Sequence, residues 1–418
     1  MTRPAARPRP IDVVLHDAKA EHPETVLRIG MVMQIAGEPV DLRQRVKRCL
    51  AGHLPDLPAL SRSIAGTGAR SRWLVNELDL DTHVRQHRLE PGGSVDDAVQ
   101  RVLRLPLPQH APLWDLHILA GHKQDGYVLF IRSHHSILDG GGLVHVLETL
   151  FRAGTSTGHG SGVVGAWTRH SVSTRHLLTA GRLLARNVIK TRFWEIADRA
   201  PSSERHFRWA SVPTSKLRAV AKAHGGGTNE AYLAAYARAL RSWATEYLPA
   251  LEDIDIHMLV PVNIRRPDEQ NEPGNYTAPA RIVLPGRVES VGELVREIVT
   301  ATGPLKGAHV RAALRTAVDR TPRAAYSLMM RVLLTPDRAV TVASNVVIRN
   351  PLQFDGDPVV SLAPLMVSTP GYPVSAVMLS YQDESTACFV TDRVLPGLDS
   401  LHRRWQDAVD EMAGVVTR

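Results

Sequence analysis

The sequence predicts a mixed α/β fold of the α+β type, built as two lobes. The chain has 418 residues, more than one hydrophobic core usually serves, so we expect two subdomains. Strand-like and helix-like segments mix in both halves without strict β–α–β alternation. A stretch rich in Gly, Ser and Thr, 154–165, is the best candidate linker. We therefore predict an N-terminal lobe over 1–153, a linker and crossover helix over 154–205, and a C-terminal lobe over 206–418.

Composition indicates a globular protein of a reducing compartment. Apolar residues make up 44% of the chain and charged residues 22%, as in ordinary soluble domains. The two cysteines, Cys49 and Cys388, are far apart in the sequence and predict neither a disulfide framework nor a metal cluster. No signal peptide is apparent, and no run approaches the roughly 20 apolar residues that span a bilayer. We expect a cytoplasmic protein, at most peripheral at a membrane or lipid surface.

The formal net charge of +8 narrows the classes of partner. The basic residues are mostly arginine and are scattered along the chain, and aromatic residues make up only 5%. Single-stranded nucleic acid is bound by aromatic side chains beside clustered positive charge, so nucleic acid is not an expected partner. A basic surface can still attract the phosphates of a co-substrate, an acidic carrier protein or anionic lipid.

The N-terminal half reads as strands and helices in alternation. Asp41 and Ser94 each precede a helix-like segment as candidate N-caps, and Ser94-Val95-Asp96-Asp97 resembles a capping box. The last two strands flank a turn that contains Gly and Asp, which predicts a β-hairpin. The predicted strands are 26–35, 72–80, 113–119 and 127–132, and the predicted helices are 42–54 and 94–103.

The C-terminal half repeats this mixture of elements. Hydrophobic periodicity indicates helices, and runs rich in Val and Ile indicate strands. The last two strands are close enough in sequence to form a hairpin. We predict helices at 173–200, 213–224, 228–247 and 399–415, and strands at 256–263, 278–283, 340–347, 359–367, 375–382 and 385–391.

Chemically reactive side chains concentrate in one stretch, SHHSILDGGG at 133–142. It follows the most strand-like run in the chain and precedes an apolar, helix-like segment, 143–151. Two adjacent imidazoles, a carboxylate four residues after the second and three glycines therefore lie where a strand end opens into a helix. Strands aim side chains and loops expose them, so reactive groups are common at such positions. The alternative is a turn with incidental histidines, since the chain contains 19 of them.

Two other kinds of site are disfavoured. His134 and His135 are adjacent on a strand, so they face opposite sides and cannot readily bind one metal ion together. The serine-hydrolase elbow pattern around Ser156 lacks the buried strand that such an elbow requires. We therefore predict no metal site and no serine hydrolase.

The stretch suits proton transfer. One histidine of the pair can point into a cleft while its neighbour packs inward, and a neutral imidazole in a cleft is a general base near neutral pH. If Asp139 faces inward it must be paired, most simply by an arginine from a distant strand. The glycines allow a substrate to approach the backbone closely. No serine or cysteine nucleophile is evident beside a base, which favours direct transfer without a covalent enzyme intermediate.

A family resemblance adds to this interpretation. The run HHSILDG at 134–140 is similar to the HHxxxDG signature of thioester-dependent acyltransferases, which include chloramphenicol acetyltransferase, plant BAHD enzymes and peptide-synthetase condensation domains. Its surroundings resemble the wax ester synthase/diacylglycerol acyltransferase branch. The similar segments, in an order that extends the likeness over 11–412, are IG at 29–30, PLWD at 112–115, VPVNIR at 260–265, GN at 274–275 and SNV at 344–346.

The resemblance implies two chloramphenicol-acetyltransferase-like lobes that form a V, with the motif midway along a central tunnel. It implies that His135 deprotonates an acceptor hydroxyl or amine, which attacks the thioester carbonyl of acyl-CoA or of a phosphopantetheine-bound acyl chain. No permanently bound cofactor is implied. The implied site residues are His135, His134, Asp139 and Asn275 as catalytic groups (Asn275 at the oxyanion), Arg265 and Gly140 as structural support (Arg265 paired with Asp139), and Gly141 and Trp114 as substrate contacts.

Departures from the family pattern leave the acceptor open. Val347-Ile348-Arg349 replaces the expected Pro-Gly-Pro, and Arg28 stands where the pattern has His. A lipid or small-molecule acceptor would give a wax ester or triacylglycerol, or a natural-product ester or amide. One alternative is a condensation-like enzyme of a polyketide or nonribosomal peptide pathway that uses an acyl or peptidyl carrier protein. Another is a non-catalytic module that binds an acyl chain or a carrier protein.

Overall fold

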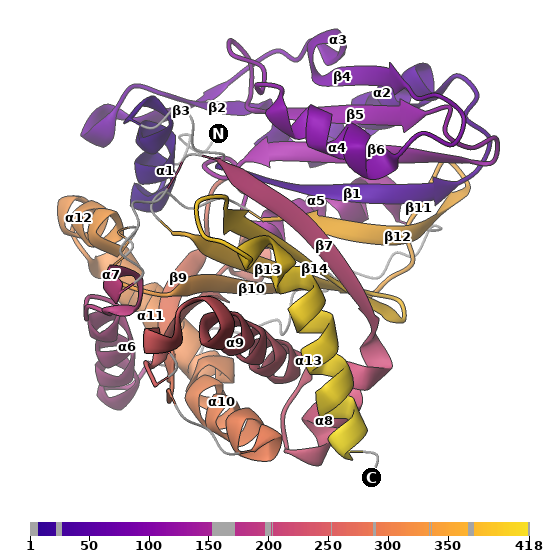
Figure 1. Ribbon diagram of the computed structural model, residues 1–418. Coiled ribbons are helices and arrows are strands. Elements are labelled where there is room, and N and C mark those ends of the chain that lie inside the picture. The colour runs from indigo at the N-terminus through magenta and orange to yellow at the C-terminus, as the bar shows by residue number, and fades with distance from the viewer. Residues whose placement is uncertain are drawn as a thin grey trace.

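The computed structural model describes residues 7–21, 27–152, 172–196, 202, 204–251, 253–286, 290–333, 335, 337–366 and 372–416. These residues contain two six-stranded sheets and a two-stranded ribbon, β2 (Arg62–Ala65) with β3 (Arg72–Val75) (Figure 1). The first sheet has the spatial order β11 (Gln353–Phe354), β12 (Asp357–Leu365), β1 (Arg28–Ala36), β6 (Gly126–His134), β5 (Trp114–Ala120) and β4 (Val84–Arg88). The second has the order β7 (Arg205–Pro213), β14 (Glu384–Asp392), β13 (Val374–Tyr381), β10 (Thr341–Ile348), β8 (Ile256–Asn263) and β9 (Thr277–Leu284).

Four of the five helices of the N-terminal half contact strands of the first sheet, and the fifth, α1 (Pro10–Glu21), packs mainly against α12 (Arg323–Leu333). The predicted cap at Ser94 is confirmed, because its hydroxyl accepts the N–H of Asp97 at 3.1 Å. Asp41 is the N-cap residue of the helix that begins at Leu42, as predicted, but its φ of 47° is left-handed and its side chain makes no cap hydrogen bond. These helices are α1 (Pro10–Glu21), α2 (Leu42–His53), α3 (Leu80–His83), α4 (Val95–Arg104) and α5 (Gly140–Phe151).

Helices α8, α9, α10 and α13 gather on the side of the second sheet that faces away from the first (Figure 1). Alanines along α9 allow close packing, and Trp405 of α13 meets the buried ring of Tyr232 edge-on at 6.4 Å. The helices of this half are α6 (Thr174–Arg186), α7 (Phe193–Ile196), α8 (Thr214–Ala223), α9 (Thr228–Tyr247), α10 (Val291–Lys306), α11 (Ala308–Arg320), α12 (Arg323–Leu333) and α13 (Leu401–Val416).

The predicted hairpin is confirmed by β5 and β6, which pair in register from Trp114↔Ser133 to Ala120↔Tyr127. Every residue of both strands is buried. A charge on such a strand has to be compensated, and Arg132 Nε accordingly donates to the Asp115 carboxylate at 2.8 Å. The hairpin thus gives rigid support to the stretch that follows it, the His-rich loop (residues 133–142).

The predicted lobe boundaries are wrong for one segment. β12 pairs antiparallel with β1, from Gly30↔Leu365 to Ile35↔Val359, and β11 extends this edge. Residues 353–365 therefore complete the first sheet, although they lie in the C-terminal half of the chain. The physical reason is that the hairpin partner β6 covers only one edge of the buried strand β1, and the other edge also needs a hydrogen-bonded neighbour.

Other differences from prediction follow from tertiary contacts. The helix predicted over 173–200 is interrupted between α6 and α7. There the carbonyls of Asn187 and Ile189 accept hydrogen bonds from Arg281 instead of continuing a helix. The strands β2, β4, β7 and β11 and the helices α1, α3, α10, α11 and α12 were not predicted. The predicted linker at 154–165, together with the elbow pattern at Ser156, lies outside the described residues.

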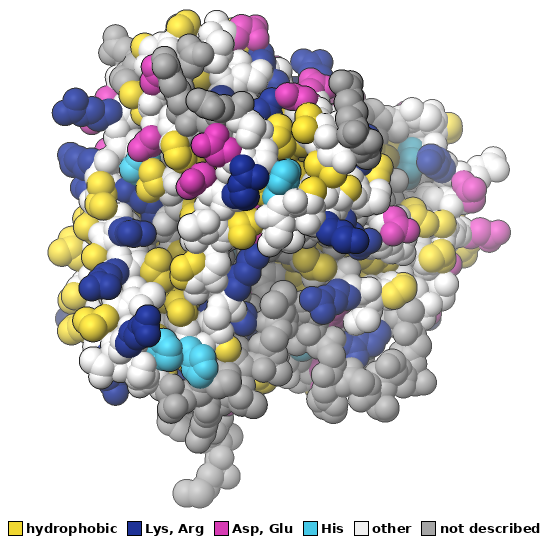
Figure 2. Space-filling model, turned by 90° about the horizontal axis from the view of Figure 1, so that it is seen from below, with side chains coloured by type: hydrophobic (Ala, Val, Ile, Leu, Met, Phe, Trp, Pro, Cys, Tyr) yellow, Lys and Arg dark blue, Asp and Glu magenta, His cyan; other side chains and the backbone are white. Residues whose placement is uncertain are grey.

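The surface agrees with the scattered charge of the sequence. Figure 2 shows lysine and arginine side chains spread over the face seen from below, with apolar and neutral groups between them. Within the described residues, no helix combines the length and the hydropathy needed to cross a bilayer.

Candidate active site

The His-rich loop is anchored by both halves of the chain. At its start, the N–H of His135 donates to the carbonyl of Leu27 at 2.8 Å. At its far end, Leu138 forms a parallel bridge with Gly274, whose N–H donates to the carbonyl of Ile137 at 2.6 Å. The loop then enters α5, with Asp139 as the N-cap. The N-terminal sheet and the segment around Gly274 therefore fix the loop jointly.

The imidazole of His135 is oriented by a hydrogen bond to the backbone. Its Nδ1 lies 3.0 Å from the carbonyl oxygen of Leu138, and because a carbonyl can only accept, Nδ1 carries the hydrogen. The lone pair of the neutral ring is therefore on Nε2. Burial lowers the pKa of His135, although the Asp139 carboxylate and the hydrogen-bonded carbonyl act in the opposite direction. The imidazole is thus unprotonated at neutral pH, as a general base requires.

His134 has a different environment. It is buried, and its Nδ1 accepts the N–H of Ser136 at 3.2 Å and the hydroxyl of Ser136 at 2.8 Å. Its side chain does not line the cavity that His135 lines. The two histidines therefore diverge, as predicted, although His135 lies in the turn that follows β6 and not on the strand. Within the described residues, no group of three or more His, Cys, Asp or Glu side chains could hold a metal ion.

The predicted ion pair between Asp139 and Arg265 is present, with Oδ1 and Nη2 3.0 Å apart and both side chains buried. Asp139 also accepts the N–H groups of Gly142 at 2.7 Å and Tyr276 at 2.8 Å. Burial opposes ionisation of this carboxyl, but Arg265 and the two N–H groups together lower its pKa. Arg265 also donates to three carbonyls and lies 4.2 Å from the centre of the Tyr276 ring. Asp139 therefore joins α5 to the segment that follows β8.

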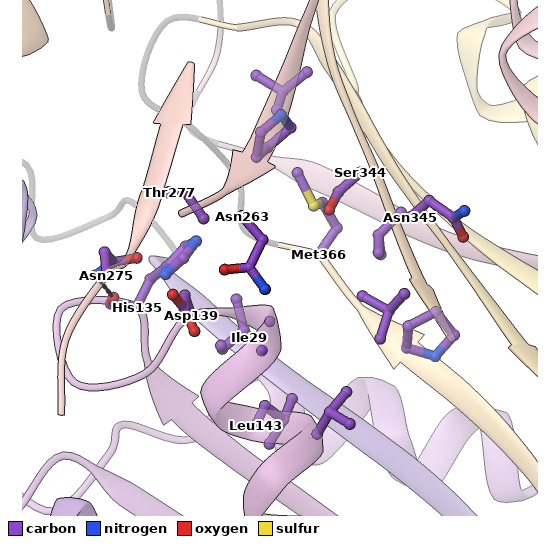
Figure 3. A pocket seen from close by; sticks show the side chains of 18 of the residues that line it. Ile29, His135, Asp139, Leu143, Asn263, Asn275, Thr277, Ser344, Asn345 and Met366 are labelled. Atoms are coloured by element: carbon purple, nitrogen blue, oxygen red, sulfur yellow. Dashed lines mark hydrogen bonds between the residues drawn. The ribbon is translucent and has the colours of Figure 1, made fainter. Parts of the chain in front are cut away.

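Asn275 does not have the contacts expected of an oxyanion donor. Its Nδ2 donates to Asp12 Oδ1 at 3.0 Å and to the backbone carbonyl of His135 at 2.6 Å, which uses both of its hydrogens. The remaining polar atom, Oδ1, is an acceptor and cannot stabilise negative charge. Figure 3 shows Asn275 and His135 next to each other on one side of the cavity. Asn275 therefore holds the backbone of the base in place, and the oxyanion role predicted for it is not supported.

Asp12 of α1 is the site residue that sequence reasoning missed. Its side chain is fully buried, and Oδ1 also accepts the N–H of Asn275 at 2.7 Å. Burial raises its pKa to about 6, although hydrogen bonds from Asn275 and Arg9 act in the opposite direction. The available signal was the Pro10-Ile11-Asp12 run, which places a carboxylate among apolar residues.

A cavity of about 350 Å³ lies between the two sheets and reaches His135 (Figure 3). Its wall is mostly apolar, with contributions from α1, β1, α5, β8, β9, β10, α12 and β12. Such a wall suits an acyl chain, and the few polar groups can orient a reacting carbonyl. The polar side chains of the wall are His135, Asp139, Asn263, Asn275, Thr277, Arg311, Ser344, Asn345 and Tyr372.

Of the remaining predicted site residues, the two glycines line the cavity and the tryptophan does not. Gly140 and Gly141, in the first turn of α5, both line the cavity, as expected for a loop that a substrate approaches. Trp114 does not line it. Its indole is fully buried, donates to the carbonyl of Leu60 at 2.7 Å and stacks on His83 at 4.2 Å. Trp114 therefore supports the first sheet, and its predicted contact with substrate is wrong.

Comparison with known proteins supports the family resemblance. The family description "wax ester synthase/diacylglycerol acyltransferase catalytic domain" matches residues 10–192, and the C-terminal domain of that family matches residues 288–413. A relative from Mycobacterium bovis, named as a proposed diacylglycerol O-acyltransferase, is 25% identical in an alignment of 266 positions that covers 56% of this chain and 58% of the relative. One from Mycobacterium tuberculosis, similarly named, is 24% identical in an alignment of 433 positions, gaps included, that covers 94% of this chain and 96% of the relative.

Solved structures have the same fold. The wax ester synthase/diacylglycerol acyltransferase of Marinobacter aquaeolei superposes with a TM-score of 0.64 at 19% identity, covering 99% of this chain and 100% of that one. The starter condensation domain of rhizomide synthetase gives a TM-score of 0.68 at 12% identity, covering 99% and 94% of the two chains. Both family domains match in order, and the fold agrees over nearly the whole length. The chain belongs to the wax ester synthase/diacylglycerol acyltransferase family.

Proposed function

We propose that the protein is an acyltransferase that moves an acyl group from a thioester to a hydroxyl or amine acceptor, with His135 as the general base. One observation carries the proposal: His135 commits Nδ1 to the carbonyl of Leu138 and lies in an apolar cavity with Nε2 as its basic atom. Such a base typically contributes a factor of about 10²–10⁴ to the rate.

The proposed reaction is a direct transfer. Nε2 of His135 takes the proton of the acceptor, whose oxygen or nitrogen forms a bond to the thioester carbonyl carbon. The carbon–sulfur bond then breaks, and the proton passes from Nε2 to the leaving thiolate. In the described part of the chain, no serine or cysteine side chain is hydrogen-bonded to His135, which favours this route over an acyl-enzyme.

The first turn of α5 is the proposed source of oxyanion stabilisation. Gly140 and Gly141 line the cavity, and the first N–H groups of a helix have no partner within the helix. The positive end of the helix dipole favours negative charge at this position. Because glycine has no Cβ, the tetrahedral centre can approach these N–H groups closely.

The names of the relatives support a choice of substrates. The names of the mycobacterial relatives point to diacylglycerol as acceptor, and the rhizomide synthetase domain was crystallised with C8-CoA. We propose a long-chain acyl-CoA as donor and an alcohol or diacylglycerol as acceptor, without a permanently bound cofactor. The condensation-domain neighbours favour one second candidate, transfer from an acyl chain on a carrier protein.

A donor–acceptor matrix tests the proposal. Purified protein is given palmitoyl-CoA or palmitoyl-carrier protein with hexadecanol, dioleoylglycerol or hexadecylamine, and the products are identified by mass spectrometry. Ester formation from palmitoyl-CoA is expected. Product from the carrier-bound donor alone would favour the condensation-like function. Thioester binding without turnover would favour the non-catalytic binding module and contradict the proposal.

A further inference from the structure

The helix α6 lies at the outer edge of the molecule and has two different faces (Figure 1). It packs against α11 and β9, and Ala180 on its inner face is fully buried. The exposed face carries large side chains that recur at helical spacing, which places them in one row. The residues of this row are Arg175, Leu178, Arg182 and Arg186.

The segment that follows α6 continues the row with apolar side chains. Val188 and Ile189 are 43% and 54% exposed, and Lys190 and Arg192 are exposed beside them. Single exposed apolar residues are ordinary on a protein surface, whereas neighbouring ones indicate an interaction site. The exposed residues of the helix and the segment are together called the α6 stripe: Arg175, Leu178, Arg182, Arg186, Val188, Ile189, Lys190 and Arg192.

Hydrogen bonds from two arginines fix the backbone of this segment. Arg281 of β9 donates to the carbonyls of Asn187 and Ile189 at 3.0 and 2.6 Å. Arg338 donates to the carbonyl of Val188, which lies between them. Three successive carbonyls are therefore held against the second sheet while the side chains of Val188 and Ile189 remain exposed. Apolar side chains held in this way contribute little to folding, but they are available for binding.

The α6 stripe is strongly basic. From Ser173 to Trp194 the sequence contains five Lys or Arg residues and no Asp or Glu. Lys190 pairs with Asp337 at 3.3 Å, but its side chain is 67% exposed, so water and salt screen this pair. Within the described residues, no ion pair joins Arg182 or Arg186 to an acid. The stripe thus places positive charge directly beside exposed apolar side chains.

One face of β9 runs from the cavity to the α6 stripe. Thr277 and Pro279 line the cavity, and the carbonyl of Pro279 accepts the side-chain N–H of Asn187 at 2.9 Å. Arg281, the next residue on the same side of the strand, holds the segment after α6. Val283 follows on that side and is 43% exposed. The stripe is therefore adjacent to the cavity wall.

We propose that the α6 stripe docks the protein on an anionic lipid surface. The apolar side chains of Leu178, Val188 and Ile189 enter the headgroup region, and the basic side chains meet the lipid phosphates. Positive charge alone would also suit an acidic carrier protein. Such a protein would need a complementary apolar site for each of these side chains, whereas a headgroup region accepts them in any arrangement. The docking holds the β9 side of the cavity close to the lipid.

Vesicle flotation of the full-length protein tests the proposal. Vesicles of phosphatidylcholine with phosphatidylglycerol are compared with vesicles of phosphatidylcholine alone, at low and at high salt. We expect binding to the anionic vesicles that weakens as salt increases, and binding to the neutral vesicles that is at least about fivefold weaker. No binding to the anionic vesicles, or equal binding to both kinds, would overturn the proposal.

Two double variants place the binding on the α6 stripe. Val188→Ser combined with Ile189→Ser removes exposed apolar surface. Arg182→Gln combined with Arg186→Gln removes exposed charge. Each double variant should bind the anionic vesicles about tenfold or more weakly than wild type, because apolar burial and charge both contribute to the affinity.

Matched double variants elsewhere on the surface are the controls. Val40→Ser with Val75→Ser changes side chains that are 63% and 74% exposed, and Arg85→Gln with Arg88→Gln changes two exposed arginines of β4. Both controls should bind as wild type does. Folded stripe variants with wild-type binding, or controls that lose binding equally, would overturn the proposal. Retention by an immobilised acyl carrier protein without flotation would also overturn it and assign the stripe to a carrier. Flotation measures binding alone, so a failure of acyl transfer would appear only in the donor–acceptor matrix.

Discussion

His135 and Asp139 are four residues apart, yet their surroundings favour a neutral group at one and a charged group at the other. Burial lowers the pKa of His135 and keeps its imidazole neutral. At Asp139, Arg265 and two N–H groups offset burial and keep the carboxyl ionised. The loop therefore holds a neutral imidazole beside a fixed negative charge, a combination that suits the proposed proton abstraction at neutral pH.

The Asp139–Arg265 pair predicts a large loss of stability on substitution. Arg265→Ala leaves a buried carboxylate without its cation, so the free energy of unfolding should fall by about 3–5 kcal/mol, measured by urea denaturation. The control is Arg393→Ala, which breaks an exposed ion pair with Glu204 of similar length, 2.7 Å. That loss should be only about 0–1 kcal/mol. Equal losses in the two variants would show that Arg265 is not needed to compensate a buried charge.

Asp12 predicts a pH-dependent stability. Its pKa in the folded protein, about 6, lies above the ordinary 3.8, so the folded state binds more protons between these values and stability falls as pH rises through them. Asp12→Asn has no titrating group at this position. Relative to wild type, its free energy of unfolding should increase by up to about 3 kcal/mol between pH 4 and pH 7. A difference that does not change with pH would contradict the burial of an ionisable Asp12.

At the scale of elements, Gly274 joins the His-rich loop to the region around β9. Its φ of 93° favours glycine, and a Cβ there would lie 2.5 Å from the Asp12 carboxylate. The contacts of Gly274 with Ile137 and Leu138 therefore depend on the absence of a side chain.

Two glycine substitutions test this. Gly274→Ala should destabilise the protein by more than about 1 kcal/mol and reduce activity, because the loop that carries His135 shifts. Gly181→Ala, in the exposed middle of α6 where a Cβ meets nothing within 4 Å, should stabilise it by about 0.5–1 kcal/mol. Thermal melting measures both changes, and a neutral Gly274→Ala would contradict the account of the loop.

Much of the element order could be predicted from local patterns, but the meeting of distant segments could not. The strands at 256–263 and 340–347 were predicted to within one residue at each end, because Val-rich runs mark them. Nothing in either run shows that β8 and β10 pair at their first residues and then separate. The missing N–H of Pro261 has an effect only when β10 lies beside β8. In the same way, the resemblance placed Asn275 in the site, but its Nδ2 hydrogens are used by the carbonyl of His135 and by Asp12, a residue 263 positions away.

At the scale of the molecule, the two lobes share strands. β12 completes the first sheet, and Trp209 of β7 donates to the carbonyl of Pro364 in β12 at 2.7 Å. β12, from the C-terminal half of the chain, thus connects the two sheets that enclose the cavity. The cavity walls therefore depend on both halves of the chain.

The shared strand predicts that the N-terminal lobe is not stable alone. A fragment of residues 1–205 would expose the edge of the largely buried strand β1 that β12 covers in the full chain. We expect it to be insoluble or to bind a hydrophobic dye. Adding residues 353–365 through a flexible linker should increase its solubility. A fragment of 1–205 that unfolds cooperatively without β12 would contradict this expectation.

The most direct test of the central claim is the rate of thioester consumption by His135→Gln. With palmitoyl-CoA and a long-chain alcohol, kcat/KM should fall by about 10²–10⁴-fold relative to wild type, because the group that takes the proton is absent. His110→Gln, at an exposed histidine outside the cavity wall, should retain the wild-type value. A folded His135→Gln protein with the wild-type kcat/KM would contradict the assignment of His135 as the base.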